Sequence, residues 1–443
     1  MSGCPCRKGV WWTYNLLGWL VSPAFGWYAV KRLCSGTSWS AYRDWTGRFP
    51  AIGHNRDQRL RFWVHAVSVG EMMAAGRLID ALRQRWSDAQ ILVTTVTETG
   101  YQTAQKIARS ADRVHFLPFD LLPFPWWGMR QFCPDALILV ETELWGNLLH
   151  SAKAIGALTV WVNGRISDAT YARGRHRLGS AVYRWLLSHL DYCLMRTPED
   201  GDRLVRLIGH SVPSEVVGDL KLEMGSVPLD ESRLSVLRQS LGLREGDPVL
   251  VAGSTHPGEE EIVLKAYQAL RSRFPSLRLI LAPRHIDRAG EVADLIARQG
   301  LRYRRRTDAN EENLDGSEVV ILDTVGELAQ VYGLATVSFV GGSLIPRGGH
   351  NLLEPAFFGV PVLFGPHIDN FRYHGAELVK SGVGYVVRDG DELVHQIIFF
   401  LKSATIRQTV SERAQKLLSQ HQGVARRIVE RVADLLREKR KRR

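Results

Sequence analysis

Short apolar segments alternate with amphipathic helical patterns along most of this 443-residue chain, and this alternation limits the folds that it can adopt. Near-continuous apolar strands joined by helices are typical of a parallel sheet that is covered on both faces. The first series of predicted strands covers residues 61–69, 90–97, 113–119, 136–144, 158–165 and 191–197. A polar stretch at 222–246 interrupts the series, which restarts at residues 248–255, 277–285, 319–324, 336–343, 361–366 and 383–389. The pattern predicts an α/β chain of two doubly wound domains with a cleft for a ligand between them.

Composition places the chain among ordinary globular proteins, because 45% of its residues are hydrophobic and 23% are charged. These values argue against a disordered chain and against a polytopic membrane protein. The net charge is +11, and the C-terminal run Lys439–Arg443 carries five of the positive charges. We interpret that run as a solvated terminus rather than as a segment that binds nucleic acid. The five cysteines lack paired C-x-x-C spacing, which predicts neither a disulfide framework nor a zinc site and favours a reducing compartment.

The N-terminal stretch Val10–Val30 contains no formally charged residue and is flanked by basic residues on both sides. It is long enough to cross a bilayer as a helix, although Asn15 and Pro23 interrupt its apolar character. Its four tryptophans favour the membrane interface; they are Trp11, Trp12, Trp19 and Trp27. Two interpretations remain open, namely a membrane anchor that spans or lies in the interface, and a buried packing helix. We expect an anchor over residues 1–35.

The segment His65–Glu71 joins the end of a predicted strand to the beginning of a helix. Gly70 would admit a ligand close to the backbone, and Glu71 falls in the first helical turn. One interpretation is a carboxylate that stabilises the helix N-terminus through the helix dipole. The other is a general base that accepts a proton from the hydroxyl group of an acceptor substrate. The motif alone favours neither.

A pair of acids, Glu141 and Glu143, follows another predicted strand. In an extended chain these carboxylates point to the same side, which is costly unless one is protonated, paired or bound to substrate. Arg165, at the end of the next strand, is a candidate partner for them or for an anionic ligand. Lys221, just before the interdomain stretch, is a candidate to stabilise negative charge on a leaving phosphate.

A glycine-rich loop, Gly341–Gly349, follows a predicted strand of the second domain. Asn351 is expected to cap the next helix, so that exposed backbone amides bind a phosphate while Glu354 accepts ribose hydroxyls. The loop matches neither a Walker motif nor a Rossmann G-x-G-x-x-G fingerprint, but we favour nucleotide binding over a purely structural turn. Pro283–Arg284 and Asp323–Glu327 follow two other predicted strands, and we expect a base and a ribose to lie against them.

His256 stands near three consecutive acids, Glu259–Glu261, and the group resembles a metal cluster. Consecutive glutamates on a helix face different directions, however, and more often form a solvated N-terminal turn. We therefore predict no metal site here and no other cofactor.

Together these motifs resemble one family, the 3-deoxy-D-manno-octulosonic acid (Kdo) transferases of glycosyltransferase family 30. The resemblance covers nearly the whole chain through HAVSVGE, VETELW, NGRIS, GDLK, AGSTHPGEEE, LAPRH, DTVGEL, FVGGSLIPRGGHNLLEP and PVLFGPHIDNF. It implies a GT-B fold of two Rossmann-like domains facing a cleft, with an N-terminal membrane-anchor helix at 1–35. Residues 36–222 would bind the acceptor. Residues 223–443 would bind CMP-Kdo and include the C-terminal helix and basic tail.

The resemblance also implies an activity, the transfer of Kdo from CMP-Kdo to a lipid A precursor, lipid IVA, in lipopolysaccharide core biosynthesis at the cytoplasmic side of the cell inner membrane. Glu71 would be the proton acceptor of an inverting single displacement, and Glu141 and Lys221 would stabilise the transition state. The CMP-binding positions would be Pro283, Arg284, Val325, Gly326, Glu327, Asn351, Leu352, Leu353 and Glu354. Val325 and Leu352 stand where the family commonly has methionine and proline, and both would contribute backbone atoms.

The chemistry of such a transfer agrees with these residues. Kdo would leave CMP through an oxocarbenium-like centre, which requires a base, anionic surroundings and a positive group near the departing phosphate. The positive net charge would favour an inner-membrane surface and a phosphorylated lipid over a nucleic acid. Two alternatives remain, a GT-B transferase that uses a UDP-sugar and a membrane-bound nucleotide-binding module without catalysis.

Overall fold

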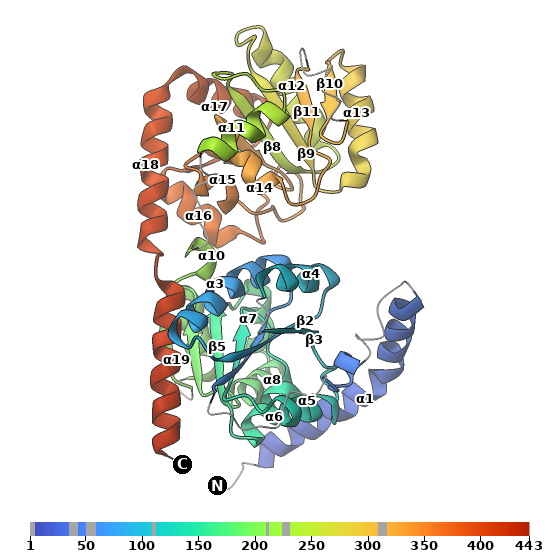
Figure 1. Cartoon of the computed structure of the whole chain (residues 1–443), viewed down its shortest axis with the longest axis vertical. Helices are drawn as coiled ribbons and strands as arrows, with labels where there is room; N and C mark the ends of the chain where they lie inside the picture. The colour runs from blue at the N-terminus through green and yellow to red at the C-terminus, as the bar shows by residue number, and fades with distance from the viewer. Residues whose placement is uncertain are drawn as a thin grey trace. The chain divides into compact units, whose positions relative to one another are not determined.

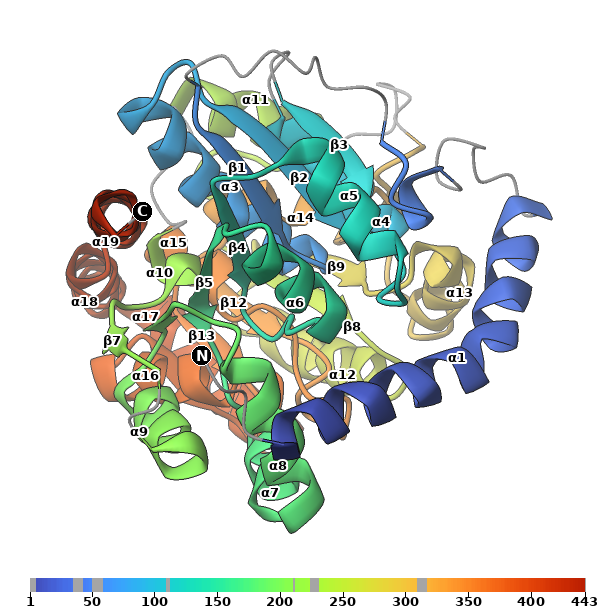
Figure 2. The same cartoon turned by 90° about the horizontal axis from the view of Figure 1, so that it is seen from below.

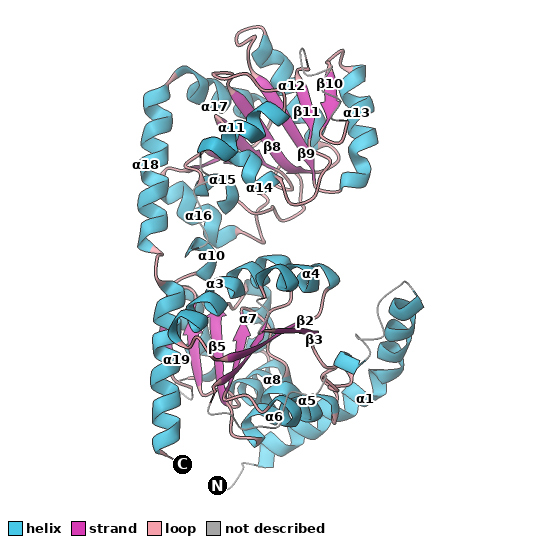
Figure 3. Cartoon of the chain, in the orientation of Figure 1, coloured by secondary structure: helices cyan, strands magenta, loops and turns pink. Residues whose placement is uncertain are grey.

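The computed structural model describes residues 5–34, 43–49, 59–108, 112–209, 212–223, 231–308 and 317–442. The chain divides into two compact units (Figure 1). The first unit comprises Met1–Met224 together with Gly423–Arg443, and the second comprises Gly225–Gln422. Each unit contains one sheet with helices around it (Figure 3). The prediction of two α/β domains with parallel sheets is thus confirmed.

The first unit is built on a sheet of seven described strands, all paired in parallel. They are β1 (Arg61–His65), β2 (Gln90–Thr95), β3 (Arg113–Phe116), β4 (Ala136–Val140), β5 (Leu158–Gly164), β6 (Tyr192–Met195) and β7 (Ser214–Val216). Their order across the sheet is β3-β2-β1-β4-β5-β6-β7. The order reverses between β1 and β4, so the loops that follow these two strands diverge. Open α/β sheets bind ligands at such a switch point, outside the carboxyl ends of the strands.

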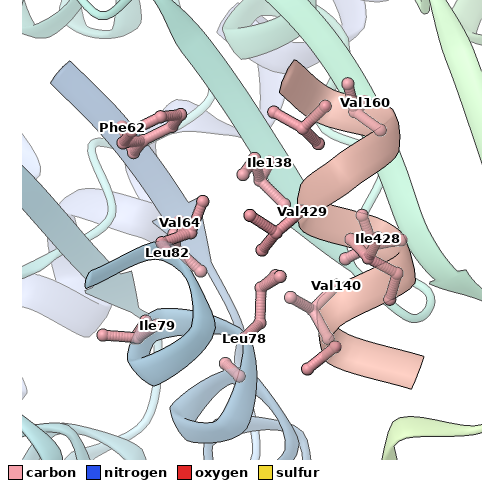
Figure 4. Packing of buried hydrophobic residues seen from close by; sticks show 14 of the residues in the cluster. Phe62, Val64, Leu78, Ile79, Leu82, Ile138, Val140, Val160, Ile428 and Val429 are labelled. Atoms are coloured by element: carbon pink, nitrogen blue, oxygen red, sulfur yellow. The ribbon is translucent and has the colours of Figure 1, made fainter. Parts of the chain in front are cut away.

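Helices cover both faces of this sheet. They are α1 (Pro5–Cys34), α3 (Val69–Arg85), α4 (Glu98–Ile107), α5 (Phe124–Phe132), α6 (Gly146–Ala154), α7 (Asp168–Arg175), α8 (Arg177–Leu187), α9 (Pro198–Ile208), α10 (Leu220–Glu223) and α19 (Val424–Lys441). One hydrophobic cluster joins the sheet to α3 and α19, and a second joins it to α5, α6 and α9. In the first cluster Leu78 of α3 and Val429 of α19 approach the β4 side chains Ile138 and Val140 (Figure 4).

Helix α19 corrects the predicted domain boundary. Residues 223–443 were expected in one domain, whereas Gly423–Arg443 belong to the first unit. Its apolar side, including Ile428 and Val432, is buried in the core of the first sheet, because an amphipathic helix must cover an apolar face. Nor is the basic tail simply solvated, since Lys439 Nζ donates to Asp191 Oδ2 at 2.8 Å. Helical periodicity shows that α19 has an apolar side, but it does not indicate which sheet that side covers.

Helix α1 occupies the place of the expected membrane anchor (Figure 2). Part of it packs on the first unit, where Tyr14 Oη donates to Asp120 Oδ2 at 2.6 Å and Asn15 is buried. Its exposed apolar side chains are Trp12, Leu16, Leu17, Trp19, Leu20, Val21 and Trp27. Within the described residues no helix is sufficiently long and apolar to cross a membrane.

The second unit repeats the plan of the first with its own sheet of seven described parallel strands. They are β8 (Val249–Thr255), β9 (Arg278–Pro283), β10 (Tyr303–Arg305), β11 (Val319–Ile321), β12 (Val337–Val340), β13 (Val362–Phe364) and β14 (Gly384–Val386). The order is β10-β11-β9-β8-β12-β13-β14, so the switch point lies between β8 and β12. The helices are α11 (Glu231–Ser240), α12 (Glu259–Arg271), η1 (Ile286–Arg288), α13 (Ala289–Arg298), α14 (Leu328–Val331), η3 (Tyr332–Leu334), α15 (Leu353–Phe357), α16 (Arg372–Ser381), α17 (Gly390–Lys402) and α18 (Ala404–Gln420).

The polar stretch at 222–246 is only partly a connection between the units. Its first residues, Leu222 and Glu223, end α10, and Glu231–Ser240 form α11 of the second unit. Residues 224–230 lie outside the described residues. None of the α11 residues is fully buried, so this helix lacks the apolar stripe by which a sequence pattern is recognised as helical.

Candidate functional site

At the first switch point, the turn from β1 into α3 holds Glu71 in a capping box. Ser68 Oγ accepts from the backbone N of Glu71 at 3.2 Å. In return, Glu71 Oε2 accepts from the backbone N atoms of Val67 at 2.9 Å and Ser68 at 3.2 Å. Both hydrogen bonds fix the carboxylate above the end of β1, so the predicted helix-stabilising role is present.

Glu71 also has a pKa suited to a general base at neutral pH. Its side chain is 8% exposed, and burial, with further effects of Glu141 and Glu143, raises its pKa to about 7 despite the two backbone donors. A carboxylate is an effective general base when its pKa lies near the working pH. The two interpretations of this residue are therefore compatible, since one carboxylate can stabilise the turn and accept a proton.

Glu141 follows β4 at the other side of the switch point. Its backbone adopts a φ of +61°, its side chain is 2% exposed, and its carbonyl accepts a hydrogen bond from Trp161 Nε1. Glu141 Oε1 lies 2.6 Å from Lys221 Nζ, so the partner of this acid is Lys221 of α10 rather than Arg165. A positive φ at a glutamate is a strained conformation that persists only where the surroundings enforce it, as is common at functional sites.

Asn163, at the end of β5, connects the pieces of this site and was not singled out from the sequence. It is fully buried with a φ of +52°. Its Nδ2 atom lies 3.4 Å from Glu141 Oε1 and 3.3 Å from Asp219 Oδ1, and its Oδ1 accepts from the backbone N of Leu220 at 3.0 Å. Asp219 Oδ1 in turn accepts from the backbone N of Lys221 at 2.8 Å. An asparagine followed by glycine at a strand end was the available signal, because Asn tolerates positive φ.

Glu143 adds a third carboxylate beside these two. Trp145 Nε1 donates to Glu143 Oε2 at 3.0 Å, and burial raises the pKa of Glu143. The same Oε2 lies 3.9 Å from Nε2 of His65, whose ring is fully buried and whose pKa is lowered by burial to about 3. Three carboxylates and one ammonium can accept a proton and stabilise a developing positive charge.

At the second switch point, buried Glu259 of α12 holds the beginning of the glycine-rich loop. Its Oε2 accepts from the backbone N of Gly342 at 2.7 Å, and its Oε1 accepts from those of Ser343 at 3.0 Å and Leu344 at 2.9 Å. These amides are occupied by a carboxylate and are not available to a phosphate. Sequence reasoning missed this structural role of Glu259, whereas its prediction of phosphate binding concerned the amides at the start of the next helix.

The three acids of α12 are neither a metal cluster nor a solvated turn. Glu259 and Glu260 are 0% and 1% exposed. Glu260 pairs with Arg288 at 2.9 Å, and Glu261 accepts from the backbone N of Gly258 at 2.9 Å. Each acid thus has a structural partner, and among the described residues no group of three metal-ligating side chains occurs.

The positions assigned to CMP fall on the strand ends of the second unit. Pro283 ends β9 and is buried, while the Arg284 side chain is exposed. Between β11 and α14, Val325 is 82% exposed and Gly326 has a φ of +91°. Glu327 accepts from Arg306 Nη2 at 3.1 Å, and this contact is the main reason that its pKa is lowered.

The remaining CMP positions surround the start of α15. Asn351 Oδ1 accepts from the backbone N of Leu353 at 3.2 Å, and its Nδ2 donates to Glu354 Oε1 at 3.0 Å. Burial raises the pKa of Glu354. Leu352 and Leu353 are buried, so they would contribute backbone rather than side-chain contacts. The N-cap residue of α15 is Leu352, without a side-chain cap, so Asn351 is not the cap of this five-residue helix but lies one position before the cap.

The structure thus brings the predicted site residues together in two groups. Glu71, Glu141 and Lys221 form one group in the first unit, and the nine CMP positions belong to the second unit.

Comparison with solved structures defines the class of fold. The UDP-GlcNAc 2-epimerase from Neisseria meningitidis, solved with UDP-GlcNAc bound, has a TM-score of 0.60 at 11% identity. The match covers 85% of this chain and 100% of that chain. This likeness shows the fold alone, which is GT-B-like with two parallel-sheet α/β units.

Sequence comparison defines the family. Residues 43–224 match a family model described as 3-deoxy-D-manno-octulosonic-acid transferase (kdotransferase). The 3-deoxy-D-manno-octulosonic acid transferase of Bordetella pertussis is 34% identical over 420 residues, covering 93% of this chain and 95% of the relative. That of Haemophilus influenzae is 32% identical over 372 residues, covering 83% of this chain and 85% of the relative. The chain belongs to the Kdo transferase family and is a glycosyltransferase.

Proposed function

We propose that this Kdo transferase moves Kdo from CMP-Kdo to lipid IVA by an inverting single displacement, with Glu71 as the proton acceptor. The observation that carries the proposal is the arrangement at the first switch point, where a carboxylate with a pKa of about 7 lies near the Glu141–Lys221 ion pair. This arrangement supplies a base and both signs of charge. A substrate that must lose a proton while a sugar–phosphate bond breaks requires all three.

Glu71 is suited to the first step. Its two backbone hydrogen bonds both go to Oε2, and we assign Oε1 to the acceptor hydroxyl. As the hydroxyl proton passes to Glu71, the hydroxyl oxygen forms the new bond to the anomeric carbon of Kdo. The bond from that carbon to the phosphate oxygen breaks, and its electron pair leaves with CMP. Attack opposite to the leaving group inverts the configuration.

Glu141 and Lys221 would act on the charges of the transition state. Lys221 forms an ion pair with the buried Glu141 carboxylate, its Nζ atom lying 2.6 Å from Oε1. The carboxylate stabilises the oxocarbenium-like sugar, and the ammonium stabilises the phosphate that departs. Asn163 and Asp219 would hold this pair in place through their hydrogen bonds to Glu141, Leu220 and Lys221.

CMP would bind to the second unit along Pro283–Arg284, Val325–Glu327 and Asn351–Glu354. These segments follow three strands of one parallel sheet, and nucleotides bind at such carboxyl ends. The Arg284 guanidinium would face the phosphate, and Glu354 would accept a ribose hydroxyl.

The acceptor is a lipid, and helix α1 offers a surface for it. Trp12, Leu16, Leu20 and Trp27 are each more than half exposed. Tryptophan and leucine on one helix favour the interfacial zone of a bilayer. We propose that α1 lies in the cytoplasmic surface of the inner membrane and that the enzyme acts there in lipopolysaccharide core biosynthesis.

The test of the activity is mass spectrometry of the lipid formed from CMP-Kdo and lipid IVA by the full chain. We expect a product heavier by one or more Kdo residues, with the inverted anomeric configuration by NMR. Competition binding separates the alternatives, because a UDP-sugar transferase would exchange bound CMP for UMP or UDP. Displacement of CMP by these nucleotides, or an unmodified lipid, would contradict the proposal.

The membrane proposal is tested by flotation with vesicles of phosphatidylethanolamine and phosphatidylglycerol. The Leu16→Ser/Leu20→Ser double variant should float less than the unmodified chain. Val236→Ser, which changes an exposed apolar residue of α11, is the matched control. Equal flotation of the three proteins would contradict the placement of α1.

A further inference from the structure

A pair of stacked histidines lies at the switch point of the second sheet and has no role in the function proposed so far. His256 follows β8, and His350 follows the glycine-rich loop after β12. Their Nε2 atoms are 2.8 Å apart, and their nearly parallel rings have centroids 5.1 Å apart. An imidazole nitrogen donates only when it carries a hydrogen, so one Nε2 donates and the other accepts. The pair is therefore neutral or shares one extra proton through its outer nitrogens.

Positive groups surround this pair. Arg284, Arg288 and Arg347 all lower the pKa of His256, after the larger effect of burial. Burial and the other histidine, with Arg284 and His285, lower the pKa of His350 to about 4. Of the three arginines, Arg288 is neutralised by Glu260, whereas Arg284 and Arg347 form no ion pair with any described residue. The site thus carries excess positive charge that a bound anion would balance.

Several backbone amides near the pair are already occupied. Glu259 accepts hydrogen bonds from the amides of Gly342, Ser343 and Leu344, and also from the backbone N of His256 at 3.1 Å. The amide of Gly349 donates to the carbonyl of Gly342 at 2.8 Å. These five amides are therefore not available to an anion, whereas the side chains of Arg284 and Arg347 are.

The glycine-rich loop is shaped around His350. Gly342 has a φ of +68°, and a Cβ atom at this position would lie 2.9 Å from Cδ2 and 3.1 Å from Nε2 of His350. A side chain at residue 342 would displace the ring. The buried Glu259 fixes the same glycine, so one acid holds both the loop and the histidine pair.

We propose that the His256–His350 pair, together with Arg284 and Arg347, binds an anionic group of the sugar-nucleotide donor and takes up one proton from solvent as it binds. The inference rests on the proposed CMP-Kdo donor. That donor carries two anionic groups, the phosphate of CMP and the carboxylate of the octulosonic acid. Both offer oxygen atoms that an imidazolium and a guanidinium bind through charge-assisted hydrogen bonds.

The sign of the pH dependence follows from the charges. Without donor, His285 and the arginines keep the pair neutral near pH 7, and Glu259 does not offset them because it is turned to the loop amides. A bound anion favours the protonated pair and raises its pKa. Proton uptake then makes donor affinity increase as the pH falls through the pKa of the bound state.

The experiment uses the full chain and the variants His350→Gln and His256→Gln, because glutamine can donate and accept but cannot take up a proton. His395→Gln, on the exposed side of α17, is the matched control. Calorimetric titration at pH 6 with cytidine, CMP and CMP-Kdo, in two buffers of different ionisation enthalpy, measures affinity and proton uptake. Cytidine has neither anion, CMP has the phosphate, and CMP-Kdo has both.

We expect the unmodified chain to take up a proton with at least one of the two anionic ligands and none with cytidine. If the pair binds the phosphate, both variants weaken CMP about tenfold and leave cytidine unchanged. If it binds the carboxylate, CMP affinity stays within about twofold and the KM for CMP-Kdo increases about tenfold.

Two results would overturn the inference: the absence of proton uptake by the unmodified chain with CMP and with CMP-Kdo, or variants that bind both ligands as the control does. The first result is measured on the unmodified chain, so it can be obtained even if a substitution prevents a variant from folding. Failure of the proposed function is a separate outcome, because it would appear as an unmodified chain that forms no Kdo-lipid at all.

Discussion

Each unit has a seven-stranded parallel sheet with a switch point, and the two units differ in the charge that each places there. In the first unit, the strand ends of β1 and β4 carry Glu71, Glu141 and Glu143 with one lysine. In the second, the strands β8 and β12 that flank the switch point lead to His256 and His350 among arginines. The switch point of each sheet therefore determines where chemistry can occur, while the residues that follow the strands determine its kind. An acidic site suits proton abstraction from an acceptor, and a cationic site suits an anionic donor.

The two units can also be compared by the backbone conformation at their strand ends. Among the described residues, the non-glycine positions with positive φ are Cys133, Glu141, Asn163 and Ser254. Glu141 follows β4 and Ser254 lies near the end of β8, both beside a switch point, and Asn163 lies near the end of β5, the neighbour of β4. Strain at both sites suggests that each is held in a shape that its local sequence would not adopt alone.

The most severe change to the acidic side is Glu71→Gln. The amide keeps the size of the side chain but cannot accept the proton, so we expect kcat/KM for Kdo transfer to decrease by about 10²- to 10⁴-fold. CMP is proposed to bind to the other unit, so its affinity should remain unchanged. Steady-state kinetics and CMP titration measure the two effects. Glu98→Gln, in the equivalent first turn of α4, is the matched control, and retained turnover in Glu71→Gln would exclude this residue as the base.

The next largest effect is expected when Lys221, the cation beside Glu71, Glu141 and Glu143, is replaced. Lys221→Met leaves Glu141 buried without its partner, and we expect about a 10²-fold decrease in kcat with a lower thermal midpoint. Lys265→Met changes an exposed lysine of α12 and should change neither quantity. Kinetics and calorimetry on the same preparations make the comparison. A variant with normal kcat would show that Lys221 is structural only.

On the cationic side, Glu259→Ala should release the loop that holds His350. Four backbone donors lose their acceptor, each at a cost of about 1 kcal/mol or more, so we expect clear destabilisation together with weaker CMP binding. Glu261, two positions later, accepts from none of these four donors but from the backbone N of Gly258, so Glu261→Ala serves as the control. Thermal unfolding with and without CMP provides the readout. Equal midpoints for the two variants would refute the role of Glu259.

The acidic site should also make stability depend on pH. The pKa of Glu71 is about 7 in the folded chain, whereas an unfolded glutamate titrates near about 4.3. Between these values the folded state binds more protons, so the contribution of Glu71 to the free energy of unfolding decreases as the pH rises and is constant above about 7. Relative to the unmodified chain, Glu71→Gln should gain about 3 kcal/mol between pH 4.5 and 8. Denaturant unfolding at several pH values measures this difference. If the free energies of unfolding of the two proteins changed in parallel with pH, the prediction would be contradicted.

The smallest effect is expected from Val325→Met on the nucleotide side. The Val325 side chain is 82% exposed, and its contribution to CMP binding would come from the backbone. We expect CMP affinity within about twofold of the unmodified chain, since exposed substitutions away from specific contacts change free energies by about 0.5 kcal/mol or less. A larger change in a CMP titration would show that the side chain itself contacts the nucleotide.

Sequence reasoning predicted most of the fold because buried strands leave a strong apolar signal. It missed β7 and β10, whose three residues each are largely exposed at a sheet edge and therefore lack an apolar run. It located Glu71, Glu141 and Lys221, because each follows or adjoins a strand end. It could not predict that Lys221 contacts Glu141, eighty positions earlier in the chain, since only the packing of α10 brings them together.

The residues that sequence reasoning missed are those whose side chains hydrogen-bond to distant segments of the chain. Asn163 and Glu259 are buried polar side chains whose hydrogen bonds satisfy backbone groups of distant loops. Their roles depend on contacts between segments that no local pattern encodes. The contact between Glu259 and the amides of the glycine-rich loop could not be predicted for the same reason, because the acid lies more than eighty positions before the loop.

The return of α19 to the first unit has a consequence for how the protein is made. Ile428, Val429 and Val432 complete a core that otherwise consists of residues from the first half of the chain. The backbone N atoms of Gly423 and Ala425 bond to Glu223, at the end of α10, at 3.0 and 2.6 Å. During synthesis, the first sheet therefore emerges from the ribosome with one face covered by α3 but incomplete until α19 follows. The second unit, whose sheet and helices are contiguous in the chain, can finish folding before the first.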